Sequence, residues 1–265
     1  MATGAILAVI GGGNMGCAVV QGLLRAGHAA SDLVIVETSG ERRVELTKLF
    51  AGILIVADAP RCDEAMIAVK PADVATACER VVAAGAQRVI SIAAGVRIAA
   101  IQSACGAHVR VIRAMPNTPA VVGLSATAMA VADTCDDADR AWARTLLQSI
   151  GIVVEIDESM LDAFTGLIGS GPAYVFYMAE SLQAAAVAEG FDEATSAKLV
   201  AQLLVGAAAL LEREPEDARE LRQRVTSPNG TTAAGIAALN DRNVPDAFVA
   251  AVRAATQRSK ELGDA

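Results

Sequence analysis

Residues 5–16 read AILAVIGGGNMG, an apolar run of the kind that forms a buried strand, followed by three glycines spaced G-x-G-x-x-G. Gly11 allows a tight bend, Gly13 lets a pyrophosphate approach the backbone, and Gly16 lets a helix pack closely on the strand. Asn14 opens the helical pattern that follows. We therefore expect a dinucleotide to contact Gly11, Gly13, Asn14, Met15 and Gly16.

Short β-type runs alternate with helical stretches through the first part of the chain. We expect strands at residues 5–10, 33–37, 53–56, 66–69, 89–92, 109–113, 126–131 and 152–156. Helical patterns lie between them at residues 14–26, 41–50, 72–84, 98–105 and 136–149. This α/β alternation predicts a Rossmann domain, a doubly wound parallel sheet.

The pattern changes after residue 156, where long Ala/Leu/Glu stretches such as 173–188 and 193–212 carry helical spacing. We therefore place a domain boundary at residue 158, with a dinucleotide-binding domain at 1–158 and an all-helical domain at 159–265. The helical segments are apolar on more than one face, which is wider than the stripe that a solvent-facing helix needs. This surplus predicts a homodimer, or a higher assembly of dimers, formed through the helical domain.

Composition excludes several other classes of protein. Lys and Arg number 22 against 30 Asp and Glu, and the net charge of -8 disfavours nucleic-acid binding. Five scattered cysteines without a C-x-x-C pair fit reduced cytoplasmic thiols, and two histidines disfavour a histidine-based metal site, so we expect no metal. The longest apolar run, residues 199–211, is 13 residues interrupted by Gln202, which predicts no membrane span. The N-terminus lacks the basic region of a signal peptide, so we expect a cytoplasmic protein.

The residues after the second expected strand bear on the choice of cofactor. Glu37 lies 21 residues after Gly16, where a carboxylate accepts hydrogen bonds from the ribose hydroxyls of NADH. Thr38, Ser39 and the two arginines that follow, Arg42 and Arg43, could instead hold the 2′-phosphate of NADPH. A carboxylate repels a phosphate, so these signals conflict and the pattern leaves both cofactors open.

The fourth expected strand ends in AVKP, and ligands of doubly wound sheets bind at the carboxyl ends of the strands. We therefore expect Ala68, Val69, Lys70 and Pro71 to border the nicotinamide half of the cofactor. Two later turn-forming segments, SIAAG at 91–95 and MPNTPA at 115–120, are expected to wall the same cleft.

A second glycine-containing segment, VTSPNGTTAAGIAAL at 225–239, combines a polar turn with the start of a helix. The backbone N–H groups of Gly230 and Thr231 at such a start can bind a small carboxylate, helped by the helix dipole. The alternative is that Thr231 and Thr232 only cap the helix.

Six motifs in this order, IGGGNMG, AVKP, SIAAG, RAMPNTPA, GSGPAYVF and VTSPNGTT, resemble the pyrroline-5-carboxylate reductase family over nearly the whole chain. The resemblance implies reduction of 1-pyrroline-5-carboxylate to proline with NADPH or NADH, at an active site where a Rossmann domain meets an intertwined helical domain. It implies that Thr232 is the substrate-contacting, catalytic threonine, whose hydroxyl can bond the ring nitrogen or the carboxylate and polarise the imine. Two departures are Asn229, where the family usually has glycine, and Glu37, where many relatives have a small or polar residue.

Two other functions fit part of the pattern. A 3-hydroxyacid or 6-phosphogluconate type dehydrogenase shares the domain order, and Gly166, Gly169 and Gly171 reproduce its glycines. Its catalytic lysine and asparagine are replaced here by Val175 and Ala179, so alcohol oxidation lacks its base. A non-catalytic NAD-binding regulator would explain the first domain and the apolar helices but leaves the SPNGTT segment unused.

Overall fold

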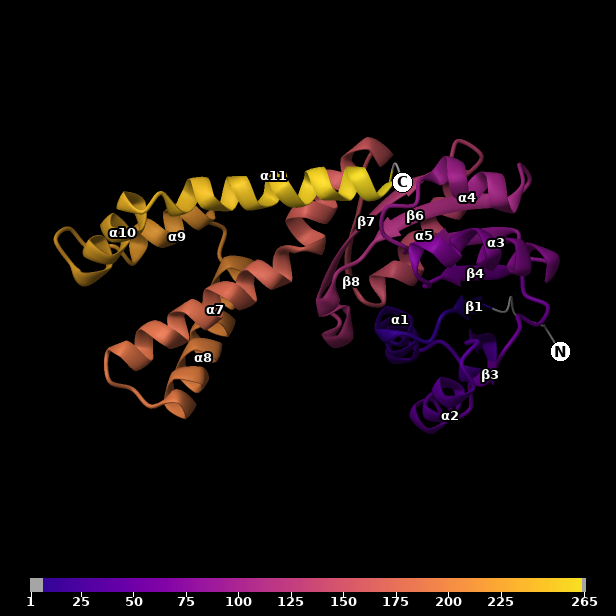
Figure 1. The fold of residues 1–265 in the computed structure, drawn as a ribbon, viewed down its shortest axis with the longest axis horizontal. Coiled ribbons are helices and arrows are strands. Elements are labelled where there is room, and N and C mark those ends of the chain that lie inside the picture. The colour runs from indigo at the N-terminus through magenta and orange to yellow at the C-terminus, as the bar shows by residue number, and fades with distance from the viewer. Residues whose placement is uncertain (1–6, 264–265) are drawn as a thin grey trace. The chain divides into compact units, whose positions relative to one another are not determined.

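The computed structural model describes residues 7–263, which Figure 1 shows as a ribbon. The chain divides into two compact units. Unit 1 comprises residues 1–170 together with 254–265, and unit 2 comprises residues 171–253. The division therefore falls after Ser170, and the last residues of the chain return to unit 1.

Unit 1 contains one eight-stranded sheet in the order β3-β2-β1-β4-β5-β6-β7-β8. The strands are β1 (Leu7–Ile10), β2 (Leu33–Val36), β3 (Leu54–Val56), β4 (Glu64–Ile67), β5 (Arg88–Ser91), β6 (Arg110–Met115), β7 (Ser125–Val131) and β8 (Gly151–Glu155). The first six are parallel, and the order reverses between β1 and β4, which is the point where doubly wound sheets bind ligands. The predicted Rossmann sheet is confirmed; the first two residues of its first predicted strand, 5 and 6, lie outside the described residues.

Strand β7 departs from the predicted all-parallel sheet, because it runs antiparallel to β6. Residues 116–124, which connect the two strands, are too few for the crossover of a dozen or more residues that parallel neighbours need. The chain then crosses through a helix and adds β8 parallel to β7.

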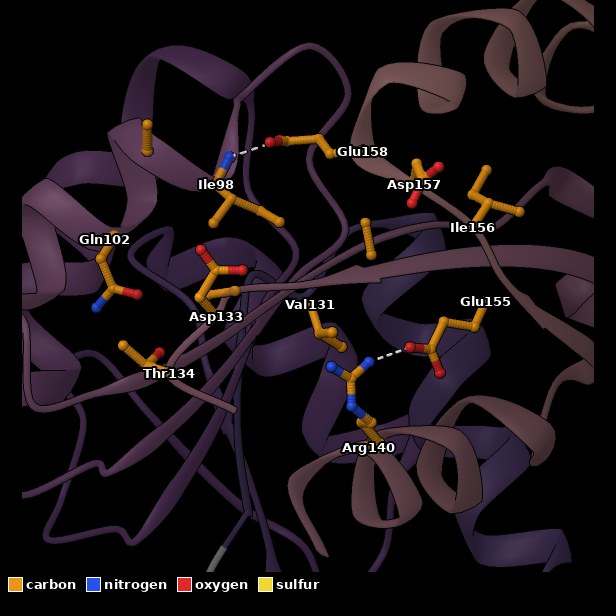
Figure 2. A pocket seen from close by; sticks show the side chains of 13 residues that line it. Ile98, Gln102, Val131, Asp133, Thr134, Arg140, Glu155, Ile156, Asp157 and Glu158 are labelled. Carbon is orange, nitrogen blue, oxygen red and sulfur yellow. Dashed lines mark hydrogen bonds and ion pairs between the residues drawn. The ribbon is translucent and has the colours of Figure 1, made fainter. Parts of the chain in front are cut away.

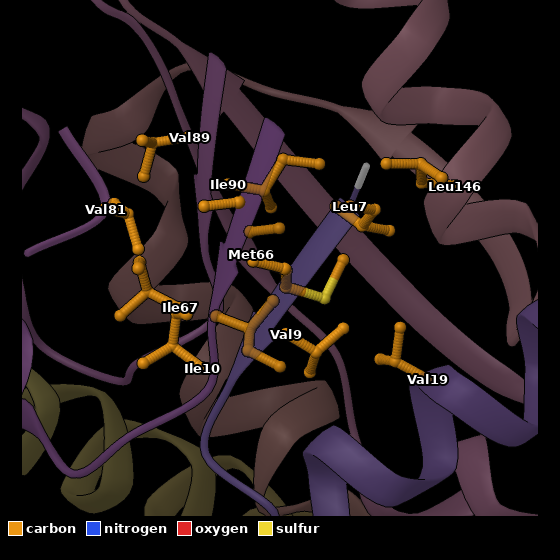
Figure 3. Close-up of a cluster of buried hydrophobic side chains, with 14 of the residues drawn as sticks. Leu7, Val9, Ile10, Val19, Met66, Ile67, Val81, Val89, Ile90 and Leu146 are labelled. Carbon is orange, nitrogen blue, oxygen red and sulfur yellow. The ribbon is translucent and has the colours of Figure 1, made fainter. Parts of the chain in front are cut away.

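The helices of unit 1 between the strands are α1 (Asn14–Arg25), α2 (Gly40–Leu49), α3 (Val74–Ala83), α4 (Ile98–Cys105) and α5 (Asp137–Gln148). Strand β1 is a continuous apolar run buried on both faces, and β4 and β5 are buried on both faces after their first, charged residues. Figure 3 shows the resulting core, in which Val9, Met66 and Ile90 from three adjacent strands lie among side chains of the covering helices. This core holds the carboxyl ends of β1, β2 and β4 at one edge of the sheet.

Unit 1 ends with three short elements and the last turns of a long helix. After β8 come the 3-10 turn η4 (Glu158–Met160), α6 (Leu161–Phe164) and the π-helical turn η5 (Thr165–Gly169). Helix α11 (Val244–Gly263) brings its last turns back to unit 1, where Ser259 Oγ donates a hydrogen bond of 2.7 Å to Asp162 Oδ1 and both residues are buried. The helix end also packs on the loop after β5, because a Cβ on Gly263 would lie 2.9 Å from the Gly95 carbonyl oxygen.

Unit 2 consists of helices, α7 (Gly171–Ala188), α8 (Glu193–Arg213), α9 (Ala218–Arg224), α10 (Thr231–Asp241) and the first part of α11. Helices α7 and α8 form a hairpin and pack along each other (Figure 1). Residues 171–253 are all described, and Val200 is the one apolar side chain among them that is buried. Phe176, Tyr177 and Leu203 are each more than half exposed. Taken alone, unit 2 has almost no interior.

Helix α8 corrects one prediction. It has 21 residues and is, within the described chain, the one helix long and apolar enough to cross a membrane. The prediction from the 13-residue apolar run was wrong about length, because the helix extends beyond that run on both sides. The finding concerns length and composition alone, and an apolar helix that packs against protein has the same properties.

Candidate functional site

The glycine loop after β1 has the geometry of an anion-binding helix start. Gly11 has φ +106°, and a Cβ there would lie 2.5 Å from the Ala68 carbonyl oxygen, so the bend requires glycine. Helix α1 begins at Asn14 with Gly13 as its N-cap, and in the described structure no side chain caps it. A Cβ on Gly13 would have no heavy atom within 4 Å. The first-turn amides of α1 therefore face an open position that a phosphate group can fill.

Gly16 explains the close packing in this loop, because a Cβ there would collide with the carbonyl oxygen of Gly11. Met15 is half-buried and packs against the hydrophobic core, so its side chain anchors the loop to that core. Backbone hydrogen bonds from Gly11 N to Val36 O and from Ala68 N to Ile10 O, both 2.8 Å, continue the strand pairing past the strand ends. The loop is thus held rigidly between β2 and β4.

Glu37, directly after β2, is joined to the glycine loop. Its Oε2 accepts a hydrogen bond of 3.0 Å from Gly12 N, and its Oε1 accepts one of 2.9 Å from Ser39 N. Ser39 is the N-cap of α2, and its Oγ accepts a hydrogen bond from Arg42 N. The carboxylate of Glu37 is therefore fixed beside the loop rather than free to rotate.

Both arginines that follow are engaged with protein groups. Arg42 donates from Nε to Gly12 O at 2.9 Å and from its guanidinium to Glu45 Oε2 at 2.7 Å. The bond to Glu45 is the main cause that raises the pKa of Arg42. Arg43 donates to the carbonyl oxygens of Glu37 and Thr38, both at 2.9 Å. The two guanidinium groups therefore brace the turn after β2.

A cavity of about 590 Å³ opens at the carboxyl ends of β1, β2 and β4. Seven of the residues predicted to bind the cofactor line it: Gly11, Gly13, Glu37, Thr38, Ala68, Val69 and Lys70. Asn14, Met15, Gly16, Ser39 and Pro71 do not line it. Pro71 opens the 3-10 turn η2 (Pro71–Asp73) that precedes α3, a position that needs no backbone donor. The sequence reasoning missed the rest of the wall, which is formed by Ile10, Val36, Ala59, Asp73 and, from α3, Thr76, Ala77, Arg80 and Val81.

The SIAAG and MPNTPA segments, expected to wall the same cleft, do not line this cavity within the described chain. MPNTPA instead braces neighbouring turns through Asn117. The Asn117 side chain donates to Ile168 O of the π-helical turn and accepts from Ala126 N, both at 3.1 Å, and the Asn117 amide donates to Ser125 Oγ. Asn117 thus ties the β6–β7 connection to the segment that leads into α7.

A buried charge lies in the same part of unit 1. Arg113 on β6 is 5% exposed and pairs with Glu158 Oε1 at 3.0 Å, which also accepts 2.7 Å from Ile98 N at the start of α4. One carboxylate therefore satisfies both a buried guanidinium and a helix N-terminus. Sequence reasoning missed this pair, because its members are 45 residues apart and neither stands in a recognisable motif.

Unit 1 also carries a larger hollow of about 900 Å³ between α4 and the ends of β7 and β8, shown in Figure 2. The charged residues in its wall are mostly acidic: Asp133, Glu155, Asp157 and Glu158 face one base, Arg140, which is paired with Glu155. None of the residues predicted to bind cofactor or substrate lines it. Residues 7–263 contain no group of three or more His, Cys, Asp or Glu side chains that could hold a metal ion.

The predicted substrate-binding residues lie in unit 2, at the start of α10. Gly230 is the N-cap of this helix, and within the described residues no side chain caps it, which disfavours a capping role for Thr231 and Thr232. Asn229 has φ +57°, so the turn keeps the left-handed backbone for which the resemblance implies glycine. The Gly230 amide already donates to Ser227 O at 3.1 Å, which leaves the amides of Thr231 and Thr232 as the first-turn donors.

Comparison with known proteins agrees with this arrangement. A family model described as pyrroline-5-carboxylate reductase dimerisation matches residues 158–262, and one described as NADP oxidoreductase, coenzyme F420-dependent, matches residues 6–95. The chain is 39% identical over 270 residues to the pyrroline-5-carboxylate reductase of Synechocystis, covering 97% of this chain and 98% of the relative.

Two solved structures resemble the whole chain. A pyrroline-5-carboxylate reductase from Coxiella burnetii has a TM-score of 0.90 at 33% identity and covers 97% of this chain and 98% of its own. The Plasmodium falciparum pyrroline carboxylate reductase with NADP bound has a TM-score of 0.86 at 27% identity and covers 98% of both chains.

Proposed function

This chain belongs to the pyrroline-5-carboxylate reductase family, and on that premise we propose that it reduces 1-pyrroline-5-carboxylate to proline with NADH or NADPH. The structural observation that carries the proposal is the uncapped glycine loop that opens into the cavity at the carboxyl ends of β1, β2 and β4. Such a loop suits a pyrophosphate, and the relative from Plasmodium falciparum was solved with NADP.

The residues of unit 1 hold the cofactor. The amides at the start of α1 bind its pyrophosphate, and Gly13 leaves room for the phosphate oxygens. Ala68, Val69 and Lys70 follow β4 and border the half of the dinucleotide beyond the pyrophosphate. When bound, the reduced nicotinamide supplies the hydride that the imine carbon accepts.

The residues at the start of α10 hold the substrate. The amides of Thr231 and Thr232 and the helix dipole bind its carboxylate, and Gly230 keeps the turn open because a Cβ there would collide with Ser227 Oγ. The hydroxyl of Thr232 hydrogen-bonds the ring nitrogen or the carboxylate, which orients the ring and polarises the imine. A substrate that arrives protonated on nitrogen needs no dedicated general acid from the chain.

The helical unit forms a homodimer. The support is the exposure of its apolar side chains: Phe176 is 68% exposed, Leu203 57% and Leu210 54%, and Val200 is the one buried apolar side chain within the fully described range 171–253. A unit of this size with so little interior gains stability by packing on a second copy. The match of residues 158–262 to a dimerisation model supports both this role and a functional boundary at residue 158. The same packing covers α8, so the apolar side chains of this helix contact protein rather than lipid.

We place the enzyme in the cytoplasm. All five cysteines lie within the described residues and are free thiols, which fits a reducing compartment. Burial raises the pKa of Cys62 and Cys135, so these thiols stay neutral and unreactive.

A steady-state assay tests the proposed reaction. The purified chain is given 1-pyrroline-5-carboxylate with NADH and, separately, with NADPH, and proline formation is measured together with cofactor oxidation. Binding of each cofactor is measured in parallel without substrate. Turnover supports the proposal. Cofactor binding without turnover would favour the NAD-binding regulator, and oxidation of a 3-hydroxyacid would favour the dehydrogenase.

A further inference from the structure

The residues that line the cofactor cavity indicate whether it binds NADH or NADPH. The cavity lies at the carboxyl ends of β1, β2 and β4, and the side chain that enters it directly after β2 is Glu37. In doubly wound sheets this position meets the ribose that carries either a 2′-hydroxyl or a 2′-phosphate. The chemistry of Glu37 and its neighbours therefore decides between the two cofactors.

Glu37 is held in place without being saturated. Each carboxylate oxygen accepts one backbone hydrogen bond, from Gly12 N at 3.0 Å and from Ser39 N at 2.9 Å. A carboxylate oxygen has two lone pairs, so each retains capacity for one further donor. The two hydroxyls of an unmodified ribose are donors. A 2′-phosphate at neutral pH offers acceptor oxygens and negative charge, which the carboxylate repels.

The arginines that could offset this repulsion are turned to other partners. Arg42 spans the Gly12 carbonyl oxygen and the Glu45 carboxylate, and a further nitrogen lies 3.5 Å from Cys17 Sγ. Arg43 donates from one nitrogen to the carbonyl oxygens of both Glu37 and Thr38. Neither Arg42 nor Arg43 lines the cavity.

Among the described residues, two cations line the cavity, Lys70 and Arg80, and neither directly follows β2. Lys70 follows β4, which is separated from β2 by β1. Arg80 comes from α3 and reaches the β3 side of the cavity, where an opposite charge, the carboxylate of Asp58, lies 3.9 Å from its guanidinium. The position directly after β2 is therefore acidic.

We propose that Glu37 makes this enzyme select NADH over NADPH, by accepting hydrogen bonds from the ribose hydroxyls and repelling a 2′-phosphate. The proposal rests on the proposed function for its kinetic readout alone. It extends the family assignment, because one relative was solved with NADP and the family membership itself leaves the preference open.

Calorimetric titration with NADH and with NADPH, without imine, tests the selection directly, and kcat/KM for each cofactor provides the second readout. The wild type is expected to favour NADH on the order of tenfold or more, since charge-assisted hydrogen bonds are replaced by repulsion. Glu37→Gln keeps the shape of the side chain and an acceptor for one of the two backbone amides, Gly12 N or Ser39 N, but removes the charge. This variant is expected to shift the NADH to NADPH ratio toward NADPH by on the order of tenfold.

Glu41→Gln is the matched control, because Glu41 is exposed in the first turn of α2 and does not line the cavity. It removes the same charge and should leave the ratio unchanged. Equal affinity for both cofactors or a preference for NADPH in the wild type would overturn the proposal. An unchanged ratio in Glu37→Gln, or an equal shift in Glu41→Gln, would also overturn it. Because binding is measured without imine, a chain that binds NADH selectively but turns over no imine would refute the proposed reaction and leave the selection intact.

Discussion

Replacing Gly13 with valine separates cofactor binding from folding. Gly13 has φ -75° and ψ -175°, an extended conformation that valine adopts readily, and its Cβ would meet no heavy atom within 4 Å in the described structure. Reduced freedom of the unfolded chain stabilises the variant by about 0.4 to 1 kcal/mol, while loss of glycine at the N-cap costs a similar amount. The net change in the free energy of unfolding should therefore be about 1 kcal/mol or less.

The effect on the cofactor is expected to be much larger. A branched side chain at Gly13 occupies the open position in front of the α1 amides, so it displaces the pyrophosphate from at least two charge-assisted hydrogen bonds. Each such bond contributes about 1.5 to 3 kcal/mol, which together weakens binding on the order of 10²- to 10⁴-fold.

Thermal unfolding and calorimetric titration with NADH check the two parts. Gly13→Val should keep its Tm within about 4 °C of the wild type, because 1 kcal/mol shifts Tm by about 2 to 4 °C at this size. Gly11→Val provides the contrast: its φ of +106° and the Ala68 carbonyl oxygen 2.5 Å from a Cβ predict that it disrupts the fold as well. Ordinary NADH affinity in a folded Gly13→Val variant would refute the assignment of this loop.

Three further predictions concern unit 2. Thr232→Ala should lower kcat/KM for the imine about 10- to 150-fold, because a hydrogen bond of about 1.5 to 3 kcal/mol is lost, and it should leave cofactor affinity unchanged. The control Thr145→Ala removes an exposed helical hydroxyl of unit 1 and should have no effect, and equal kinetics for Thr232→Ala and the wild type would count against the substrate contact. The double variant Leu203→Glu, Leu210→Glu should form inactive monomers or aggregates, because unpaired charges in an interface cost several kcal/mol. Light scattering coupled to size-exclusion chromatography measures the mass, and a fully active wild-type monomer near 27 kDa would refute the homodimer. Asn229→Gly should preserve activity and Tm, whereas Asn229→Val should lower the free energy of unfolding by about 1 to 2 kcal/mol, because a β-branched residue is strained at a φ of +57°. Equal Tm values for the two variants would contradict this.

Local pattern was sufficient for most of the fold. Every predicted strand is present within two residues of its expected bounds in the described chain. The reason is that buried strands and amphipathic helices can be recognised locally, from the spacing of their apolar residues and from the glycines that flank them. The antiparallel direction of β7 was predictable in principle, because residues 116–124 are too few for a crossover. It was missed because the apolar run alone carries no direction.

Contacts between distant residues were beyond reach. Nothing in the sequence around Asn117 indicates that it bonds Ile168, 51 residues away, and nothing near Glu158 indicates Arg113. The glycine loop and Glu37 were predictable as a site because their spacing is a motif with a mechanism. The hydrogen-bond partners of Arg42 and Arg43 were not predictable, because both side chains are long enough to reach either a phosphate or the carbonyl oxygens that they contact.

The return of α11 to unit 1 has a consequence for synthesis and folding. The Rossmann sheet is complete by Glu155, yet Ser259 and Gly263, which are translated after the whole of unit 2, complete the packing around Asp162 and Gly95. Unit 2 is therefore a long loop closed at both ends by unit 1, and the N-terminal half cannot reach its final stability as an independently matured nascent domain. Truncation before Ser259 should therefore lower the stability of the nucleotide-binding unit first, although most of that unit is translated before unit 2.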